Sequence, residues 1–417
     1  MSAPAALPAV VATAVHPAAA RLLHTSDWHL GRNFHGESLL SEQQAAIDRL
    51  IELASNDEVD LVVIAGDLYD RAIPPADAVS LFNEALVRLH DTGAKIVAIA
   101  GNHDSAARVA VADQLLEHAG VTIRGDVARC TRPLRLDPDD SGPTVAVFPV
   151  PYLEPSVAGP VLRRLDDTDG AEAAVAPRRF RHYDVTDHAT TLIRRYAASL
   201  GPVRTVVVAH TFVAGGITSD SERELTVGDI DLVDMSAFDG FNYVALGHLH
   251  RDQAFDNGRV AYSGTPLPYS FSEERDIKSV RIVEMDTQGR CRTEVVPLGV
   301  GRPLRTLRGA FDDLLVNSEF ADAERARVRI QLTDLDLPLQ AMPRLQQRFP
   351  HAVVLDHQPD GHVAAGSGDV ASAVRSGMGP LDLTLRFWSE LHGADASEPQ
   401  QAVLREALAA TGTEDDR

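Results

Sequence analysis

The sequence predicts an α/β fold in which buried sheets and helices form layers. From residue 21 to about residue 297, short apolar runs alternate with amphipathic stretches. The apolar runs are rich in Val, Ile and Leu, and most of them end in Gly, Asp or His, as buried strands followed by polar loops do. Because alternating strands and helices fold into sheets covered by helices, this pattern favours the α/β class.

The first region contains eight predicted strands and two clearly predicted helices. The strands are residues 21–27, 61–66, 95–100, 144–150, 204–209, 242–247, 259–263 and 279–285. A helix over residues 41–54 opens with Ser41 and Gln44 at the spacing of a capping box. A second helix over residues 76–90 follows Pro74 and Pro75, which favour a helix start.

The pattern changes after residue 298, and we predict further domains there. Predicted strands at 328–332 and 352–356 flank a helical segment at 343–349, so residues 298–360 form a small α/β domain after the main domain of residues 21–297. Residues 361–380 are rich in Gly, Ala and Ser, which predicts a linker. Two terminal helices follow within residues 381–417, at 381–392 and 398–410. Residues 1–20 contain no Lys or Arg, which favours a disordered extension over a signal peptide.

Composition restricts the chemistry and the location. The two cysteines, Cys130 and Cys291, are too few for a disulfide framework or a thiolate zinc site, so we expect a reducing cytoplasm and a metal held by oxygen and imidazole. No apolar run reaches the roughly 18 residues of a membrane-spanning helix. The net charge of −21 argues against a stand-alone DNA binder, because neutralising phosphates needs Lys and Arg. Bound cations, a local Arg cluster or a basic partner could supply that charge.

Five short polar signatures lie where predicted strands end. They are Asp27-Trp28-His29, Gly66-Asp67, Gly101-Asn102-His103-Asp104, His210, and Gly247-His248-Leu249-His250. Each alone has a simpler explanation, such as a turn, a helix cap or a half-buried histidine. Together they predict a ligand site beyond the carboxyl ends of the strands. Mixed oxygen and nitrogen ligands suit two ions of Mn, Fe or Zn better than Ca or Mg, and one carboxylate can bridge such a pair.

This order of motifs resembles the calcineurin-like metallophosphoesterase superfamily. More narrowly, residues 23–32, 65–70 with the following prolines, 100–104, 246–250 and 262–266 resemble the SbcD family, the nuclease subunits of bacterial SbcCD complexes. The resemblance is close from residue 21 to about residue 300 and much less specific in the tail. It implies a layered β-sandwich flanked by helices, a small α/β capping domain and C-terminal partner-binding helices.

The resemblance also implies roles for individual residues. One metal ion would be bound by Asp27, His29, Asp67 and His250, and the other by Asp67, Asn102, His210 and His248. His103 would stay off the metals and stabilise or protonate the leaving oxygen, with Asp104 orienting it. Arg32 and Arg108 follow metal motifs and are candidates for contacting substrate phosphate. One departure is Asp70, where archaeal counterparts carry a histidine.

The function that the resemblance implies is an Mn-dependent DNA nuclease working with an SbcC-like SMC-family ATPase. Such a complex would be an ATP-dependent double-strand exonuclease and a single-strand and hairpin endonuclease in DNA repair, recombination and replication, built around a homodimer within a heterotetramer. One alternative is a small-molecule phosphodiesterase or phosphatase, against which the extra domain after residue 298 argues. Another is a scaffold without catalysis, against which the full ligand set with His103 argues.

Overall fold

The computed structural model describes residues 18–137, 143–166, 180–222, 232–359, 379–392 and 395–411. The chain divides into two compact units, Met1–Leu304 and Arg305–Arg417, whereas we predicted a domain boundary after residue 297. Most of the predicted extension and linker lies outside the described residues, but Ala18–Ala20 belong to the first strand, which begins earlier than predicted. None of the helices in the described ranges combines the length and the apolar character that a membrane span needs.

The first unit contains two six-stranded sheets, and the first of them has the order β14-β13-β1-β4-β5-β6. Its strands are β1 (Ala18–Thr25), β4 (Leu61–Ile64), β5 (Lys95–Ile99), β6 (Val121–Arg124), β13 (Ser279–Asp286) and β14 (Cys291–Pro297). β1, β4, β5 and β6 are mutually parallel, whereas β13 runs antiparallel to both β1 and β14. The carboxyl ends of β1, β4 and β5 therefore meet at one edge of this sheet.

The second sheet has the order β11-β12-β10-β9-β8-β7. Its strands are β7 (Leu134–Leu136), β8 (Val145–Val150), β9 (Arg204–His210), β10 (Tyr243–Gly247), β11 (Gln253–Phe255) and β12 (Val260–Tyr262). The inner strands β8, β9, β10 and β12 are parallel, and the two edge strands are antiparallel to their neighbours. This sheet likewise presents the ends of its central strands, β9 and β10, at a single edge.

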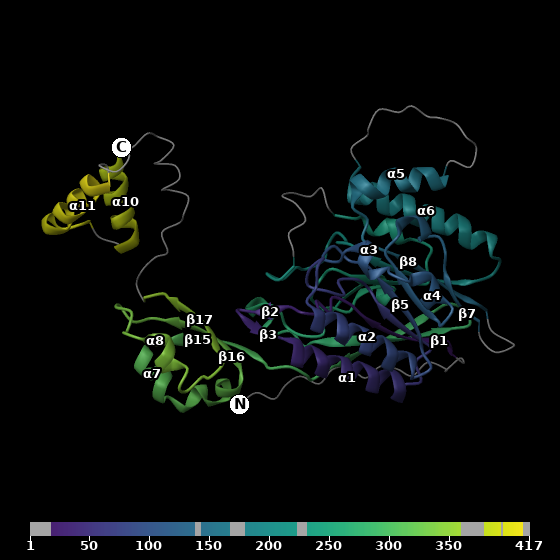
Figure 1. Cartoon of the computed structure of the whole chain (residues 1–417), viewed down its shortest axis with the longest axis horizontal. Helices are drawn as coiled ribbons and strands as arrows, with labels where there is room; N and C mark the ends of the chain where they lie inside the picture. The colour runs from purple at the N-terminus through teal and green to yellow at the C-terminus, as the bar shows by residue number, and fades with distance from the viewer. Residues whose placement is uncertain are drawn as a thin grey trace. The chain divides into compact units, whose positions relative to one another are not determined.

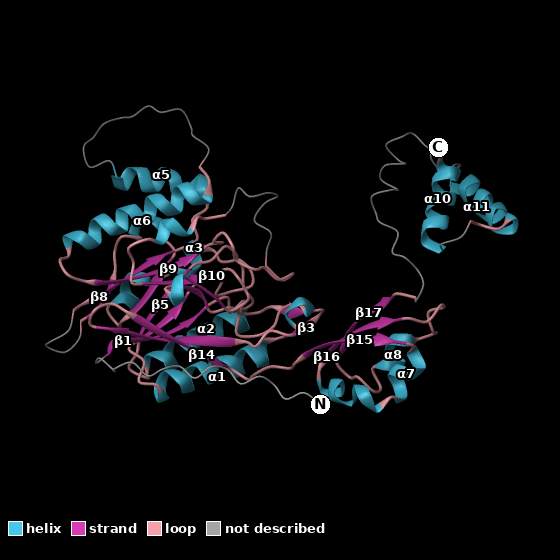
Figure 2. Cartoon of the chain, turned by 180° about the vertical axis from the view of Figure 1, so that it is seen from behind, coloured by secondary structure: helices cyan, strands magenta, loops and turns pink. Residues whose placement is uncertain are grey.

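Three hydrophobic clusters hold the unit together as four layers. Helices α1 (Leu40–Asn56) and α2 (Ala76–His90) pack on one face of the first sheet, and α5 (Pro155–Asp166) and α6 (His182–Ser199) pack on one face of the second. The two sheets pack face to face through alternate residues, among them Leu22, Val63, Val208 and Ala245. Figures 1 and 2 show the sheets between the two helical layers. The predicted layered β-sandwich flanked by helices is confirmed.

Most predicted elements are present, with a few differences. All eight predicted strands of the first region are found, whereas the short β6, β7, β11 and the edge strand β14 were not predicted. Helix α1 begins at Leu40 and has no side-chain cap, so the predicted capping box at Ser41 is wrong. Ser41 lies inside the first turn, and the Ser38 hydroxyl accepts instead from the Leu40 amide at 3.3 Å.

Short elements complete the first unit. They are β2 (Asn33–Phe34), β3 (Glu37–Ser38), α3 (Ala106–Val109), α4 (Asp113–Glu117) and the 3-10 helices η1 (Val127–Arg129), η3 (Met235–Phe238), η4 (Asp256–Gly258) and η5 (Phe271–Glu273).

The second unit contains a three-stranded sheet and a separate pair of helices. The sheet has the order β15-β16-β17, and its elements are β15 (Leu304–Gly309), α7 (Phe311–Val316), η6 (Ser318–Arg325), β16 (Arg327–Leu332), α8 (Ala341–Leu345) and β17 (Ala352–His357). Phe311, Ile330 and Phe349 are central in its core. The terminal helices α10 (Pro380–His392) and α11 (Glu398–Thr411) pack against each other.

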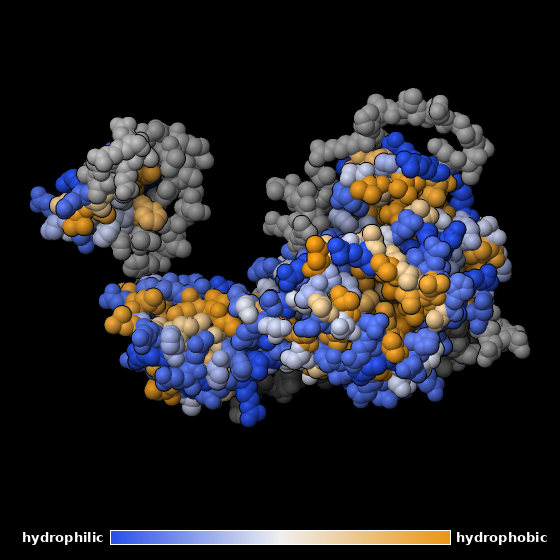
Figure 3. Space-filling model, in the orientation of Figure 1, coloured by the Kyte–Doolittle hydropathy of each residue, from blue (hydrophilic) through white to orange (hydrophobic). Residues whose placement is uncertain are grey.

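The connection between β16 and α8 carries several exposed apolar side chains. Leu335, Leu337 and Leu339 are 74%, 52% and 88% exposed. In Figure 3, apolar residues appear in orange between hydrophilic ones on the visible face of this unit.

Candidate metal centre

The strand-end residues from both sheets meet at one place in the first unit. Asp27 and His29 follow β1, Asp67 follows β4 and Asn102 follows β5, all from the first sheet. From the second sheet, His210 ends β9, and His248 and His250 follow β10. The Asp and His members of this set are at most 4% exposed, and Asn102 is half-buried. The structure thus brings together all seven predicted ligands.

Glycines permit this convergence. A Cβ on Gly101 would lie 2.1 Å from Asp67 Oδ1, so the β5 loop can approach the β4 loop only without a side chain. A Cβ on Gly247 would lie 1.9 Å from the Ala65 carbonyl oxygen, where β10 of one sheet meets the end of β4 of the other. The Gly-Asn and Gly-His steps in the motifs are therefore steric requirements of the site.

Several candidate ligands have left-handed backbone conformations. Their φ angles are +53° for Asp27, +44° for His29, +47° for Asp67 and +109° for His248. Residues other than Gly rarely adopt such angles, and the surrounding structure must hold them. The buried Gln43 of α1 does so for the first loop, since its amide donates to the His29 carbonyl at 2.8 Å and accepts from the Gly31 amide at 3.0 Å.

One half of the cluster is formed around two imidazoles. His29 Nε2 lies 3.2 Å from His250 Nε2 and 3.7 Å from Asp67 Oδ2. Asp27, His29 and His250 each present one potential ligand atom within 4.8 Å of the others. Both oxygens of the Asp27 carboxylate also accept from the His248 amide, at 3.0 and 3.1 Å.

The other half is formed around the Asn102 side chain. Asn102 Oδ1 lies 2.8 Å from His210 Nε2 and 3.2 Å from His248 Nδ1. His210 Nε2 also lies 3.5 Å from Asp67 Oδ2. Because His210 Nδ1 faces the Ala65 carbonyl at 2.9 Å, Nδ1 carries a proton and donates it there. A proton on Nε2, or a metal cation in its place, would satisfy the Asn102 and Asp67 oxygens that face this atom.

The electrostatics of this cluster favour a cation. Burial, together with the neighbouring Asp67, raises the pKa of Asp27 to about 6. Burial alone would lower the pKa of His210, but the carboxylates of Asp67 and Asp27 raise it to about 9. Within the described residues, Asn102 Nδ2 and His29 Nδ1 are buried without hydrogen-bond partners. Lone pairs that converge on each other in a buried site fit divalent ions with mixed oxygen and nitrogen ligands.

His103 lies beside the cluster, and its ring is fixed by the backbone. Its Nδ1 donates to the Asp70 carbonyl oxygen at 2.8 Å, and its ring centroid is 4.7 Å from that of His29. Its amide donates to Asp67 Oδ1 at 2.9 Å. His103 also forms a close group with His29 and Asp67 in which a metal ion could be held.

Asp104 has different partners from those that we predicted. Its carboxylate accepts from the amides of Gly101 at 2.9 Å and of Leu68 and Tyr69 at 3.0 Å. The ring of His103 is oriented by Asp70 instead. Asp104 therefore joins the β4 and β5 loops, and it acts on the position of His103 only through the backbone.

The two predicted phosphate-contacting arginines differ in their surroundings. Arg32 lies near the cluster, where its guanidinium donates to Asp70 Oδ1 at 3.2 Å and to the Ser221 carbonyl at 3.3 Å, and stacks over the Tyr269 ring. Arg108 is exposed on the short helix α3 that follows Asp104.

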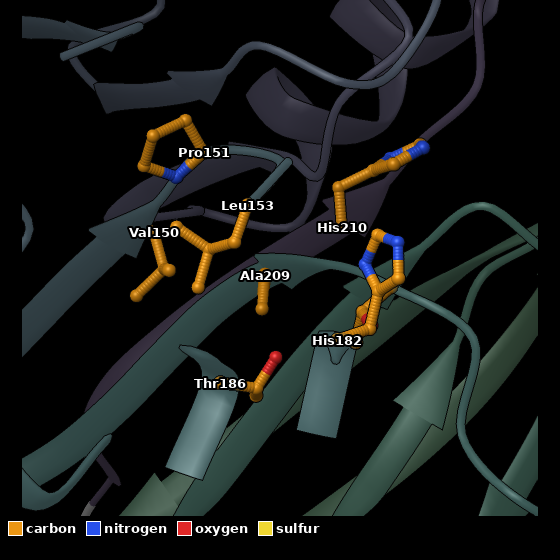
Figure 4. A pocket seen from close by; sticks show the side chains of 8 residues that line it. Val150, Pro151, Leu153, His182, Thr186, Ala209 and His210 are labelled. Carbon is orange, nitrogen blue, oxygen red and sulfur yellow. The ribbon is translucent and has the colours of Figure 1, made fainter. Parts of the chain in front are cut away.

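A small pocket adjoins the cluster, and the space of about 250 Å³ that it encloses includes open solvent. Its lining consists of Val150, Pro151, Leu153, His182, Thr186, Ala209, His210 and Thr211. Figure 4 shows Val150, Pro151 and Leu153 on one side and the rings of His182 and His210 on the other. The ring of Tyr152 lies 5.6 Å from that of His182 and 6.3 Å from that of His210. No sequence motif marked His182, because it begins helix α6 and lies far along the chain from every strand-end motif.

Three further residues near His250 were also missed. Ser221 and Glu222 hydrogen-bond to His250, and Glu273 hydrogen-bonds to Ser221. They lie in segments between strands that carry no strand-end motif. In the sequence, only their polar or acidic character could have identified them as candidates for the site.

Comparison with known proteins identifies the family. Residues 20–252 match the family model described as calcineurin-like phosphoesterase. Among solved structures, TT1561 of Thermus thermophilus is 12% identical, with 67% of this chain and 99% of that chain covered and a TM-score of 0.38. A dimetal phosphatase from Danio rerio is 11% identical, with 67% and 97% covered and a TM-score of 0.39. The assignment rests on the sequence match, which spans more than half of the 417 residues, and the protein belongs to the calcineurin-like phosphoesterase family.

Proposed function

We propose that this protein is a two-metal DNA nuclease subunit of the SbcD kind. The observation that carries the hydrolytic part of the proposal is the buried cluster of imidazoles, carboxylates and one amide between the ends of the two sheets. Family membership supports phosphoester hydrolysis as the reaction. The choice of DNA as the substrate rests on the motifs that resemble SbcD and on the second unit.

Seven side chains would hold the two metal ions. Asp27, His29, Asp67 and His250 would hold one, and Asp67, Asn102, His210 and His248 the other. Asp67 is the natural shared ligand, because its Oδ2 lies 3.7 Å from His29 Nε2 and 3.5 Å from His210 Nε2. When bound, the ions would neutralise charge on the phosphoryl oxygens and lower the pKa of an attacking water. Mn²⁺ suits this donor set and is the ion that we propose.

His103 would act as the general acid for the leaving oxygen. Its Nδ1 is held by the Asp70 carbonyl, so its Nε2 is the atom free to carry a proton. Hydrogen bonding of its amide to Asp67 ties the position of the ring to the proposed shared ligand. His103 would therefore protonate the departing oxygen of the cleaved phosphodiester, or stabilise its charge, after the scissile phosphate is bound.

The substrate would be held partly by this chain and partly by a partner. Arg32 is the arginine that we propose contacts a phosphate, because its Asp70 partner lies 3.8 Å from His29 Nδ1. The net charge of −21 leaves much of the hold on DNA to an SbcC-like ATPase and to a second copy of this chain. The helical pair α10 and α11, with Phe387 53% exposed, is the surface that we propose for the ATPase.

The same charge favours a second candidate, a phosphodiesterase for small molecules. Two assays with Mn²⁺ distinguish the DNA nuclease from the small-molecule phosphodiesterase. One measures cleavage of plasmid DNA and of hairpin or blunt oligonucleotides, and the other measures hydrolysis of bis(p-nitrophenyl) phosphate. We expect cleavage of both DNA and the small ester, with DNA cleavage increased by the ATPase partner. Hydrolysis of the ester with no cleavage of any DNA end, hairpin or single strand would overturn the nuclease proposal. Inactivity on both would overturn hydrolysis itself.

A further inference from the structure

Behind the candidate ligands, a buried chain of hydrogen bonds ends on His250. Ser221 Oγ lies 2.5 Å from His250 Nδ1 and is also hydrogen-bonded to the Glu273 carboxylate. The three residues are 8%, 2% and 1% exposed in the order Ser221, His250 and Glu273. The serine comes from the chain after β9, and the glutamate from η5, which precedes β13. Two distant connections therefore meet behind one imidazole.

The direction of the protons in this chain follows from its partners. Glu273 accepts from Lys278 Nζ at 2.5 Å, from Ser219 Oγ at 3.0 Å and from the Tyr269 amide at 3.3 Å, as an ionised carboxylate does. A carboxylate can only accept, so the hydroxyl proton of Ser221 points to Glu273. The oxygen of Ser221 then accepts a hydrogen bond from the protonated Nδ1 of His250.

This arrangement selects one tautomer of His250. A neutral imidazole with its proton on Nδ1 has its lone pair on Nε2. Nε2 is the atom that faces the centre, 3.2 Å from His29 Nε2. A histidine that ligates metal through one nitrogen commonly donates from the other to an acceptor that fixes the ring.

The backbone of His250 is held by charged side chains as well. Its amide donates to Glu222 Oε1 at 2.8 Å, and its carbonyl accepts from Lys278 Nζ at 2.9 Å. The Lys278 and Glu273 side chains are 8% and 0% exposed, and burying such an ion pair is costly. Both members of this ion pair hold His250. Glu273 reaches the His250 ring through Ser221, and Lys278 binds the His250 carbonyl.

We propose that Ser221 and Glu273 are positioning residues that hold His250 with its Nε2 lone pair directed at a metal ion. This proposal rests on the proposed function only in requiring that the cluster bind metal, and it does not depend on DNA as the substrate. Lys278 and Glu222 support it by fixing the backbone on either side of the ring.

The test compares Ser221→Ala and Glu273→Gln with a matched control, Ser279→Ala. Ser279 is also buried, at 2% exposure, and its hydroxyl has no hydrogen-bond partner in the described structure. Mn²⁺ binding is measured from free Mn²⁺ by electron paramagnetic resonance, and stability by urea unfolding in EDTA. We expect Ser221→Ala to weaken one of two Mn²⁺ sites by roughly 10- to 100-fold, as loss of an outer hydrogen bond to a ligand does. The control should bind both ions as the wild type does.

Two further comparisons distinguish a loss of positioning from a loss of stability and from failure of the nuclease proposal. Ser221→Thr, which keeps the hydroxyl, should restore most of the lost affinity, whereas a purely structural effect would follow the loss of stability in EDTA. Unchanged affinity for two Mn²⁺ ions in both Ser221→Ala and Glu273→Gln would overturn the proposal. Wild-type protein that binds two Mn²⁺ ions but cuts no DNA would overturn the nuclease assignment alone. In that case the loss of Mn²⁺ affinity in Ser221→Ala would still support the positioning role.

Discussion

His24 joins the two sheets whose ends form the candidate metal centre, and proton uptake at this histidine in the unfolded chain should destabilise the fold at mildly acidic pH. It is fully buried on β1, its Nε2 donates to the Leu246 carbonyl at 3.1 Å, and its Nδ1 accepts from the Tyr243 hydroxyl at 3.0 Å, both on β10. Burial, reinforced by the charge of Arg281, lowers the pKa of His24 from 6.5 to about 3. The neutral ring thus has both nitrogens satisfied, and the charged ring is excluded until the pH is very low.

The sign and size of the effect follow from this shift. Between pH 6.5 and about 3, the unfolded chain takes up a proton at His24 that the folded chain does not. The stability contributed by the neutral ring is therefore complete above pH 6.5 and is lost as the pH falls. From pH 7 to pH 5 the loss from this one group is about 2 kcal/mol, since the unfolded state gains that much from protonation.

The assay compares the wild type with His24→Gln, which can keep both hydrogen bonds but does not titrate. Unfolding in urea is followed by the fluorescence of Trp28, in a Trp388→Phe background, with EDTA present at both pH values. We expect the wild type to lose about 2 kcal/mol more than His24→Gln between pH 7 and pH 5. Other groups that titrate in this range contribute equally to both proteins. Equal losses in the two proteins would refute the reasoning.

Three shorter predictions concern the site and the core. Gly247→Ala should lose at least ~1–3 kcal/mol in urea unfolding, because the new Cβ would lie 1.9 Å from the Ala65 carbonyl; wild-type stability would contradict the required close approach. Cys130 is fully buried, and burial raises its pKa to about 12, so Ellman's reagent at pH 8 should modify it only after unfolding, and rapid labelling of native protein would disagree. His103→Ala should keep its bound metal and lose activity by roughly 10²- to 10⁴-fold, whereas Asp67→Ala should lose metal too. Elemental analysis beside hydrolysis rates checks this, and parallel loss of metal and activity in His103→Ala would make His103 a ligand.

The meeting of the candidate ligands could be predicted because each lies at the end of a strand. Parallel strands bring their carboxyl ends to one edge, so the sequence positions of Asp27, Asp67 and Asn102 already implied that they are neighbours. The same strand-end rule predicted that His210 and His248 would join them, whereas the sandwich of two sheets was implied by the family resemblance. The convergence of these ligands could be predicted because it depends on residue identity and on the local strand pattern, both of which the sequence shows.

The parts of the site and the fold that could not be predicted depend on contacts between segments far apart in the sequence. Ser221 and Glu273 form a chain to His250 although no periodicity or motif marks either residue. Helix α5 was missed because Gly159 and Pro160 interrupt its pattern, yet Gly159 is buried and Pro160 is accommodated inside the helix. The family resemblance implied that Asp104 orients the ring of His103, whereas the Asp104 carboxylate accepts hydrogen bonds from the loop after β4.

The carboxylates of the cluster also accept hydrogen bonds from the backbone of neighbouring loops, and these bonds help to hold the strained backbone of the candidate ligands. Asp27 accepts from the His248 amide, and Asp67 accepts from the His103 amide, so each carboxylate braces a loop from another strand. The positive φ angles of Asp27, Asp67 and His248 are therefore maintained by the same groups that would bind the ions. It also follows that an alanine at either aspartate removes a brace together with a ligand, whereas asparagine keeps an acceptor oxygen for the brace and removes the negative charge that a metal ligand would supply.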